Sequence, residues 1–421
     1  MAAVHPGSSA PTFPVRPSPV IPDFAGGCLV NVVPALLARV GVGRPGSAGR
    51  ATAATPHGLG SSDGEGRSEA WIPEPVAHAR QIVLLVLDGL GWLQLQDRAA
   101  LAPVLATASG GAVTSVAPST TAAALTSLTT GLPPSVHGVL GYRVQVDGGI
   151  LNVLRWQRNG ADARESIPPR QFQPHPPFPG YGAGVRDGED GSSRGSEVPV
   201  VSRADYASTG FTAAHLDGTV LHGWHTPSGV VVEILDLVRR GSPFVYAYYD
   251  GVDKVAHARG LGAHYDAELG CVDRMVGDVL EGLPEGAVLV VTADHGQVDV
   301  GRAAEVLGPE VMGGVELLSG EGRFRWLHTR PGALGDVVEA AEARYSPIAW
   351  VRTKEQVIDE GWFGGEPLPH VADRLGDVAL VPFAPTAFLD PADVGEQRLC
   401  ARHGSLTDAE MLVPLLSWPP R

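Results

Sequence analysis

Cysteine is scarce in this sequence. Only three of the 421 residues are cysteines, and they lie far apart, at Cys28, Cys271 and Cys400. An odd number of widely separated cysteines does not form the disulfide framework of a small secreted domain. It also lacks the paired spacing of a zinc site built from thiolates. The cysteines therefore give no sign of an oxidising compartment, and any metal site must use other ligands.

A signal peptide and a membrane span are also missing from the pattern. The N-terminal stretch MAAVHPGSSAPTFPVRPSPV has neither the basic region nor the apolar core that a signal peptide needs. The longest apolar stretch without a charge, residues 24–38, is too short to cross a bilayer and contains Asn31 and Pro34. These absences predict a cytoplasmic protein with no membrane span.

Positive charge is in short supply. Lys and Arg together number 31 against 46 Asp and Glu, which gives a formal net charge of −15. A general nucleic-acid-binding surface would be basic, so the balance argues against one. An anionic small molecule would have to be attracted locally, most simply by bound metal ions.

The length suits one large α/β domain that carries an inserted cap. Residues 1–22 are rich in Pro and Ser and predict a disordered tail ahead of a domain spanning 23–421. Residues 43–77 are rich in Gly, Ser and Ala and predict a flexible loop. A cap or insertion is expected at about 143–240, which contains PPRQFQPHPPFPGYGAG and RDGEDGSSRGSE, and a second insertion or edge element at about 305–370.

Three continuous apolar runs predict parallel strands that are covered on both faces. They are QIVLLVLD at 81–88, FVYAYYD at 244–250 and AVLVVTAD at 287–294. Residues 264–280 have apolar side chains at helical spacing, so the last two runs and this segment predict a strand–helix–strand unit. Weaker strand candidates are residues 229–235 and 377–382.

Each of these three runs ends in Asp. The acids are Asp88, Asp250 and Asp294, with Asp253 just beyond the second run and His295 directly after the third. Ligands of an open α/β sheet bind beyond the carboxyl ends of its strands, so the acids are expected to converge there. A single Asp after a strand is more often a turn former or a helix cap. The recurrence at one structural place is what favours a shared site.

Histidines add to this set of acids. Asp253 and His257 are four residues apart, which places them on one face of a helix. His403, before Gly404, predicts a loop histidine near the C-terminus. Carboxylate and imidazole suit zinc and several other divalent metals. The other histidines lack such partner spacing and are taken as structural or unassigned, among them His137, His175, His215, His222, His225, His328 and His370.

Residues 117–142, APSTTAAALTSLTTGLPPSVHGVLGY, predict a short helix with hydroxyl residues at its start. Ser119, Thr120 and Thr121 precede an Ala-rich run that is closed by Gly131 and a following Pro. An ordinary helix cap is the simplest interpretation of these hydroxyls. With metal ligands nearby, the same helix N-terminus would favour an anion such as phosphate.

In combination, these motifs resemble the alkaline phosphatase superfamily, and most closely its type I phosphodiesterase/nucleotide pyrophosphatase family. The matching pieces, in order, are VLDGLG (86–91), STTAAALTSLTTGLPPSVHG (119–138), DGVDKVAH (250–257), TADHG (292–296) and HG (403–404). The resemblance implies a three-layer α/β sandwich with a mostly parallel central sheet and an inserted cap. It also implies a hydrolase of small phosphate esters or diesters.

The resemblance further implies two divalent metal ions, usually zinc, with manganese as the alternative. Asp253, His257 and His403 would hold one ion. Asp88, Asp294 and His295 would hold the other, which would also face the nucleophile. Counting back ten residues from Gly131 makes Thr121 the nucleophile, with Thr120 as the fallback. Thr121 would attack phosphorus and form a phosphothreonine, which water then hydrolyses.

Two positions depart from the family pattern. The family often has an aromatic residue after the nucleophile, where this chain has Ala122, and an Asn where it has Tyr142. The Tyr142 hydroxyl can replace the amide as a substrate-binding donor, or the ring can pack in the core. The main alternative is a phosphomonoesterase, for which Arg143 is the nearest cation in sequence. A non-catalytic phospho-ligand binder is the alternative outside the enzymes.

Overall fold

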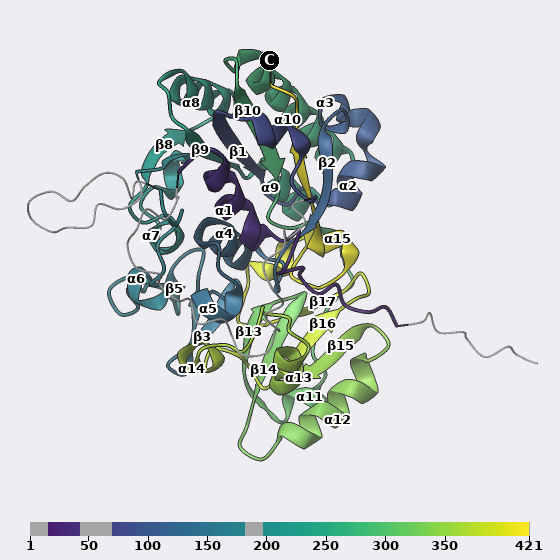
Figure 1. Ribbon diagram of the computed structural model, residues 1–421. Coiled ribbons are helices and arrows are strands. Elements are labelled where there is room, and N and C mark those ends of the chain that lie inside the picture. The colour runs from purple at the N-terminus through teal and green to yellow at the C-terminus, as the bar shows by residue number, and fades with distance from the viewer. Residues whose placement is uncertain (1–15, 43–69, 182–196, 421) are drawn as a thin grey trace, which may run out of the picture.

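The computed structural model describes residues 16–42, 70–181 and 197–420. Figure 1 shows a larger part built on a central sheet and, below it, a smaller part built on a second sheet. The central sheet has seven strands in the order β2-β19-β10-β1-β9-β7-β8. Their bounds are β1 Gln81–Leu87, β2 Ser109–Thr114, β7 Pro199–Arg203, β8 Val220–Trp224, β9 Phe244–Tyr249, β10 Ala287–Thr292 and β19 Leu412–Ser417.

The central sheet is mostly parallel, as predicted. β10, β1, β9, β7 and β8 run parallel to one another, and β19 is antiparallel to both β10 and β2. β9 and β10 are buried along their whole length, and β1 is buried at all but its first residue. Because these strands carry apolar side chains on both faces, helices cover both sides of the sheet.

The helices form two layers around this sheet. α1 (Leu29–Arg39) packs on α4 (Thr121–Thr130), and α4 also contacts α7 (Gly210–His215). The connections β8–α8–β9 and β9–α10–β10 run in one direction across the sheet and place α8 (Pro227–Arg239) beside α10 (Ala263–Gly282) on the opposite face. The helix predicted at 264–280 is α10.

The strand predicted at 229–235 is wrong, because these residues lie inside α8. Pro227 occupies the first turn of that helix, where its missing N–H costs nothing. Val230, Ile234, Leu237 and Val238 are buried at helical spacing, while Val232 is exposed. The apolar run is therefore one face of a helix rather than a strand covered on both faces.

The second insertion forms a sheet of its own. β13 (Val315–Glu321), β14 (Phe324–Thr329), β16 (Val378–Pro382) and β15 (Ala349–Thr353) are antiparallel in the order β13-β14-β16-β15. α12 (Leu334–Tyr345) packs on β15 and β16, and an apolar core lies between helix and sheet. The strand predicted at 377–382 is β16, so it belongs to this second sheet.

The segment predicted as a cap, about 143–240, divides between two places. Its first part forms a small antiparallel sheet of β3 (Arg143–Val146), β4 (Gly149–Asn152), β5 (Gln157–Arg158) and β6 (Ala161–Asp162), followed by α6 (Pro169–Phe172). Its last part contains β7, α7, β8 and α8, which belong to the central sheet and its helical layers. The cap boundary near residue 240 therefore lies too far along the chain.

The predicted tail and loop lie partly outside the described residues. Residues 1–15 of the tail and 43–69 of the loop are not described. In the described part of the tail, the N–H of Val20 donates to the Leu406 carbonyl at 2.8 Å, and Pro17 accepts a bond from the indole of Trp350 at 2.8 Å. The described end of the loop contains the short helix η1 (Glu74–His78).

The remaining described elements are short, apart from α9, which carries part of the site. They are α2 Trp92–Asp97, η2 Ala99–Leu101, α3 Pro103–Ala106, α5 Pro134–His137, η3 Ala204–Tyr206, α9 Gly251–Arg259, β11 Val298–Asp299, β12 Ala304–Val306, α11 Pro309–Met312, α13 Lys354–Asp359, α14 Pro369–Ala372, β17 Ala387–Leu389, η4 Glu396–Arg398, β18 Ala401–Arg402 and α15 Asp408–Met411. None of the described helices combines the length and apolar character that a membrane-crossing segment requires.

Candidate active site

The carboxyl ends of the central strands bring the predicted acids together. Asp88 follows β1, Asp294 follows β10, and Asp253 lies in the first turn of α9, just after β9. The N–H of Asp253 donates to the Asp88 carbonyl at 3.0 Å, and the N–H of Gly89 donates to the Asp294 carboxylate at 3.0 Å. The convergence predicted from the sequence is therefore present at this edge of the sheet.

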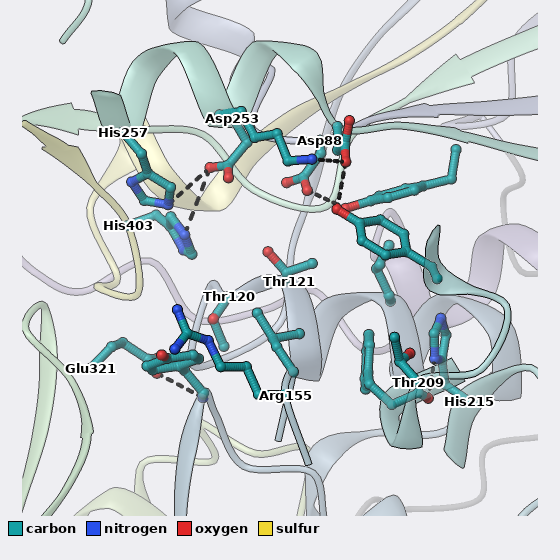
Figure 2. Close-up of a pocket in the computed structure, with 18 of the residues that line it drawn as sticks. Asp88, Thr120, Thr121, Arg155, Thr209, His215, Asp253, His257, Glu321 and His403 are labelled. Carbon is teal, nitrogen blue, oxygen red and sulfur yellow. Dashed lines mark hydrogen bonds and ion pairs between the residues drawn. The ribbon is translucent and has the colours of Figure 1, made fainter. Parts of the chain in front are cut away.

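One group consists of Asp253, His257 and His403, whose ligand atoms lie close enough to share one ion. The Nε2 atom of His257 is 3.2 Å from Asp253 Oδ1, and the Nε2 atom of His403 is 3.9 Å from the same oxygen. Figure 2 shows both imidazoles turned toward the Asp253 carboxylate. α9 supplies the first pair by its four-residue spacing, and the loop after β18 supplies His403.

The second group consists of Asp88, Asp294 and His295, all of them buried. The Nε2 atom of His295 lies 3.4 Å from Asp88 Oδ1 and 3.4 Å from Asp294 Oδ2. The two groups adjoin, because the His295 and His403 rings stack with their centroids 3.5 Å apart. All six side chains proposed from the sequence as metal ligands thus form two neighbouring clusters of three.

The three histidines share one orientation. Nδ1 of His257 lies 2.8 Å from the Ala401 carbonyl, Nδ1 of His403 lies 2.9 Å from the Ser119 carbonyl, and Nδ1 of His295 lies 3.0 Å from the Gly296 carbonyl. A carbonyl oxygen can only accept, so each contact places the ring proton on Nδ1. In the neutral ring, Nε2 then faces the carboxylates with its lone pair, as a metal-binding histidine requires.

The acids at this site need a cation that the described side chains do not supply. Asp88 Oδ1 and Asp294 Oδ2 are buried and have no hydrogen-bond partner among the described residues. Burial and the nearby Asp294 and Asp253 raise the pKa of Asp88 well above its ordinary value. Burial, together with His295 and His257, lowers the pKa of His403 well below its ordinary value. Unpartnered carboxylate oxygens beside imidazole nitrogens fit divalent cations.

Thr121 lies beside both groups at the start of α4. Thr120 caps this helix in an extended conformation without a side-chain capping bond, and Thr121 is the first helical residue. The Thr121 hydroxyl is 3.2 Å from Nε2 of His295, and the residue is only 8% exposed. The predicted hydroxyl therefore stands at a helix N-terminus, where free N–H groups favour negative charge. The fallback, Thr120, lines the same cavity.

A cavity of about 470 Å³ opens in front of Thr121. In Figure 2, Glu321 and Arg155 lie on one side of Thr121, and Thr209 and His215 lie on the other. The second of these sides is largely apolar, with Leu125, Phe211 and Leu216 among its lining residues. The cavity therefore offers space on both sides of the hydroxyl.

Some side chains that the sequence suggested do not reach the cluster. Asp250 directly follows β9, but its carboxylate is engaged by Arg203 at 3.0 Å, by Lys254 at 2.6 Å and by the Tyr206 hydroxyl at 2.5 Å. Arg143 pairs with Asp390 at 2.5 Å. The Asp250 carboxylate and the Arg143 guanidinium are therefore held by other side chains and are not free to bind a substrate.

Other residues of the cavity were missed by the sequence analysis. They are Arg155 of the small sheet, Glu321 at the end of β13 and His215 of α7. Burial lowers the pKa of His215 to about 4, and its Nδ1 lies 2.7 Å from the Phe211 carbonyl. Burial raises the pKa of Glu321 to about 8. No motif or spacing marks these residues, because they come from segments that only the fold brings together.

Tyr142, predicted as a substrate-binding residue, does line the cavity. Its N–H donates to the Glu321 carboxyl at 2.9 Å, and its hydroxyl oxygen accepts a bond from the Asn152 amide at 2.6 Å. The ring is therefore neither free in solvent nor packed in the core.

Comparisons with known proteins agree with the fold and the motifs of this chain. Residues 82–406 match the type I phosphodiesterase/nucleotide pyrophosphatase family. A comparison with curated protein sequences found no match. Murine ectonucleotide pyrophosphatase/phosphodiesterase 5 is similar in structure, with a TM-score of 0.58 and 17% identity over 80% of this chain and 87% of that one. An inactive variant of it in complex with AMP gives a TM-score of 0.59 and 17% identity, over 80% and 88% of the two chains.

A bacterial enzyme shares the same fold. Phosphonoacetate hydrolase from Sinorhizobium meliloti, in complex with phosphonoformate, has a TM-score of 0.57 and 19% identity over 82% of this chain and 90% of that one. The family match spans most of this chain, including both acid–histidine groups and Thr121. The chain therefore belongs to the type I phosphodiesterase/nucleotide pyrophosphatase family, a family of phosphoester hydrolases within the alkaline phosphatase superfamily.

Proposed function

We propose that the chain hydrolyses small-molecule phosphodiesters through a phosphothreonine formed on Thr121. The observation that carries this proposal is the place of the Thr121 hydroxyl, at a helix N-terminus and 3.2 Å from Nε2 of His295. It faces a cavity that is also lined by Asp88, Asp253 and His403. A hydroxyl in this position is both accessible to a phosphoryl group and surrounded by groups that can activate it.

Asp253, His257 and His403 would hold one divalent cation, and Asp88, Asp294 and His295 would hold the other. Mixed carboxylate and imidazole ligands favour zinc, with manganese as the alternative. When bound, such cations neutralise charge on phosphoryl oxygens and favour the ionised forms of hydroxyl and water nucleophiles. With three protein ligands in each group, room remains for substrate.

The reaction would proceed in two displacements. Thr121 Oγ1 attacks phosphorus opposite the leaving oxygen, so the bond from Oγ1 to phosphorus forms while the bond to the leaving group breaks. The hydroxyl proton passes to solvent, and the leaving group departs as an alkoxide or phenolate. Water then attacks phosphorus, so the bond from the water oxygen to phosphorus forms while the bond to Oγ1 breaks; a proton from the water or solvent restores the Thr121 hydroxyl, and a phosphate monoester is released. The N-terminal N–H groups of α4 would stabilise the added negative charge.

The cavity supports a diester over a simple monoester. A diester carries two organic groups, and the cavity extends to both sides of Thr121, toward Arg155 and toward His215 (Figure 2). The neighbours that bind AMP and phosphonoformate show that related proteins of this fold accept small phosphorus-containing ligands. A phosphomonoesterase is the second candidate, because Arg155 places a cation in the cavity where one could meet a third phosphoryl oxygen.

Metal content and activity measured together test this function. We expect the purified protein to bind two zinc or manganese ions per chain and to hydrolyse bis-para-nitrophenyl phosphate faster than para-nitrophenyl phosphate. Chelation should abolish both activities, and returning the metal should restore them. A faster monoester reaction would establish the second candidate instead. Hydrolysis that survives complete metal removal would refute the two-cation proposal.

A further inference from the structure

Arg155 stands out in the cavity because its charge is unmatched. The other two cationic lining residues have acidic partners: Lys254 lies 2.6 Å from Asp250, and Arg402 lies 3.6 Å from Glu396. Among the described residues, no carboxylate lies within ion-pair distance of the Arg155 guanidinium. Figure 2 shows this guanidinium pointing into the cavity on the side of Thr120 and Glu321.

Glu321, which lines the same side of the cavity, does not offer a matching charge. Glu321 projects from the second sheet and is 9% exposed, and its Oε1 atom has no hydrogen-bond partner among the described residues. Burial raises the pKa of its carboxyl to about 8, so it stays largely protonated at neutral pH. Glu396 is engaged by Arg325 at 2.6 Å. The positive charge of Arg155 is thus left for a ligand.

Tyr142 supplies a second donor on the same side. Its hydroxyl oxygen accepts a bond from Asn152 Nδ2 at 2.6 Å, and Asn152 Oδ1 accepts the N–H of Arg155 at 3.0 Å. Asn152 therefore ties the tyrosine to the backbone of the arginine. Because the Tyr142 oxygen is used as an acceptor, its own proton is directed to a different partner, and none lies among the described residues.

The position of this pair separates it from the reacting phosphoryl group. Arg155 is an exposed residue of the turn between β4 and β5, whereas Thr121 is buried beside the two acid–histidine groups. A phosphoryl group attacked by Thr121 would lie deep in the cavity, and the organic group on its outward side would reach the small sheet. Arg155 and Tyr142 would meet that organic group.

We propose that Arg155 and Tyr142 bind a second anionic group on the substrate, so that the preferred substrates are phosphodiesters in which one esterified group carries a carboxylate or a phosphate. The guanidinium would supply a charge-assisted, two-pronged contact, and the phenol a single hydrogen bond. This inference rests on the proposed phosphodiesterase function and deepens it. Arg155 and Tyr142 act as specificity-determining residues, and Asn152 as the positioning residue between them.

Three substrates that differ in one substituent test the proposal. They are para-nitrophenyl phenyl phosphate and its para-carboxyphenyl and para-phosphonophenyl counterparts. We expect the native protein to prefer the two diesters that carry a second anionic group, and Arg155→Gln to lower that preference in kcat/KM by about tenfold or more, since a hydrogen bond to a charged group contributes on that scale. The larger of the two preferences identifies the anion. Tyr142→Phe should lower it by a smaller factor.

Arg158→Gln is the matched control. Arg158 belongs to the same small sheet, but its side chain bonds the Asp147 carbonyl at 3.0 Å and does not line the cavity. Its substitution should leave the preference unchanged. Equal rates on all three substrates, or a preference that survives Arg155→Gln, would overturn the proposal. So would a loss in Arg155→Gln confined to para-nitrophenyl phosphate, which would assign Arg155 to the third oxygen of a monoester.

Binding separates this proposal from the function on which it rests. The metal-loaded Thr121→Ala protein, titrated calorimetrically with para-carboxyphenyl phenyl phosphate, should bind it more tightly than diphenyl phosphate, which lacks the second anionic group. Adding Arg155→Gln should remove that difference. If the native protein hydrolyses none of the diesters but this difference is present, the anion site stands and the phosphodiesterase function fails. If the diesters are hydrolysed and the difference is absent, the anion site fails alone.

Discussion

Two residues that are not themselves metal-ligand candidates, Gln297 and Gly89, hold the acid–histidine groups in place. The Gln297 amide donates to Asp253 Oδ1 at 2.6 Å, and Gly89 lies against both of these residues. A Cβ atom on Gly89 would lie 2.7 Å from Gln297 Nε2 and 2.9 Å from Asp253 Cβ. The family motif around Asp88 therefore needs a residue without a side chain immediately after the ligand.

Gly89→Ala is predicted to weaken metal binding as well as folding. Gly89 has φ +75°, where an L side chain costs about 1–2 kcal/mol, and its methyl group would push Asp253 and Gln297 out of position. Gly41→Ala is the control, because Gly41 has φ +72° with nothing within 4 Å of the added atom. Both variants should lose similar backbone stability. Only Gly89→Ala should lower metal affinity in a titration, and equal affinities would contradict the role given to this contact.

Glu321 gives the stability of the protein a predictable pH dependence. Burial raises the pKa of its carboxyl from 4.5 to about 8 in the folded state. A raised pKa means that the folded state binds the proton more tightly, so the contribution to stability is complete below pH 4.5 and is lost as pH rises toward 8. Glu321→Gln keeps an acceptor for Tyr142 N–H but cannot ionise.

Urea unfolding at fixed metal concentration, at about pH 5 and about pH 8, measures this difference. The native protein should lose more stability between the two pH values than Glu321→Gln does. Subtracting the two proteins cancels the pH dependence of metal binding and of the other titrating groups. An identical loss in both would show that Glu321 is already ionised at neutral pH.

At the scale of elements, much of the architecture follows from local patterns. β1, β9 and β10 were predictable because strands covered on both faces read as continuous apolar runs, and the acids that end them had to meet at one sheet edge. The start of α4 was predictable because hydroxyl residues precede an Ala-rich run. The group of Asp88, Asp294 and His295 follows from these strands, whereas His403 of the other group comes from the loop after β18.

Other elements were not predictable, for physical reasons. Residues 229–235 are mostly apolar and rich in β-branched side chains, and only packing shows that α8 buries one side of them. Asp250 shares the strand-end position of Asp88, yet Arg203 and Lys254 hold its carboxylate away from the cluster. Arg155 enters the cavity only because a small sheet folds over it, and no local pattern marks that placement.

The cap of α7 should matter for the apolar side of the cavity. Thr209 Oγ1 accepts the N–H of Thr212 at 3.1 Å, and α7 carries Phe211 and His215 into the lining. Thr209→Ala should cost about 1 kcal/mol of stability and raise KM for diesters more than it lowers kcat. Thr226→Ala is the control, because Thr226 caps α8 without a side-chain capping bond. Thermal unfolding measures the loss of stability, and steady-state kinetics measures KM and kcat. Equal changes in Thr209→Ala and Thr226→Ala would contradict the role given to the Thr209 cap.

At the scale of the whole molecule, the site depends on both parts of the fold. The central sheet, α9 and the loop after β18 supply the two acid–histidine groups, and the second sheet supplies Glu321. A buried ion pair joins these parts: Arg323 Nε lies 2.7 Å from Glu410 Oε1, and both side chains are fully buried. Glu410 also accepts the N–H of Ser405 at 3.0 Å, two residues after His403.

Arg323→Met is predicted to destabilise the protein strongly, because it leaves the Glu410 carboxylate buried without its partner. The expected loss is about 3–5 kcal/mol in the free energy of unfolding. Adding Glu410→Gln should recover part of that loss, since the amide keeps an acceptor but carries no charge. Urea unfolding of both single variants and the double variant gives the coupling between the two sites. Additive losses would contradict a direct partnership.

The central claim is that Thr121 attacks the substrate at a site formed by these two groups. The measurement that tests it most directly is hydrolysis of bis-para-nitrophenyl phosphate by native and Thr121→Ala proteins, each loaded to the same measured metal content. We predict that the native protein turns the diester over and that the variant, although folded and metal-loaded, loses at least about two orders of magnitude in kcat. A Thr121→Ala protein with undiminished turnover would contradict the account.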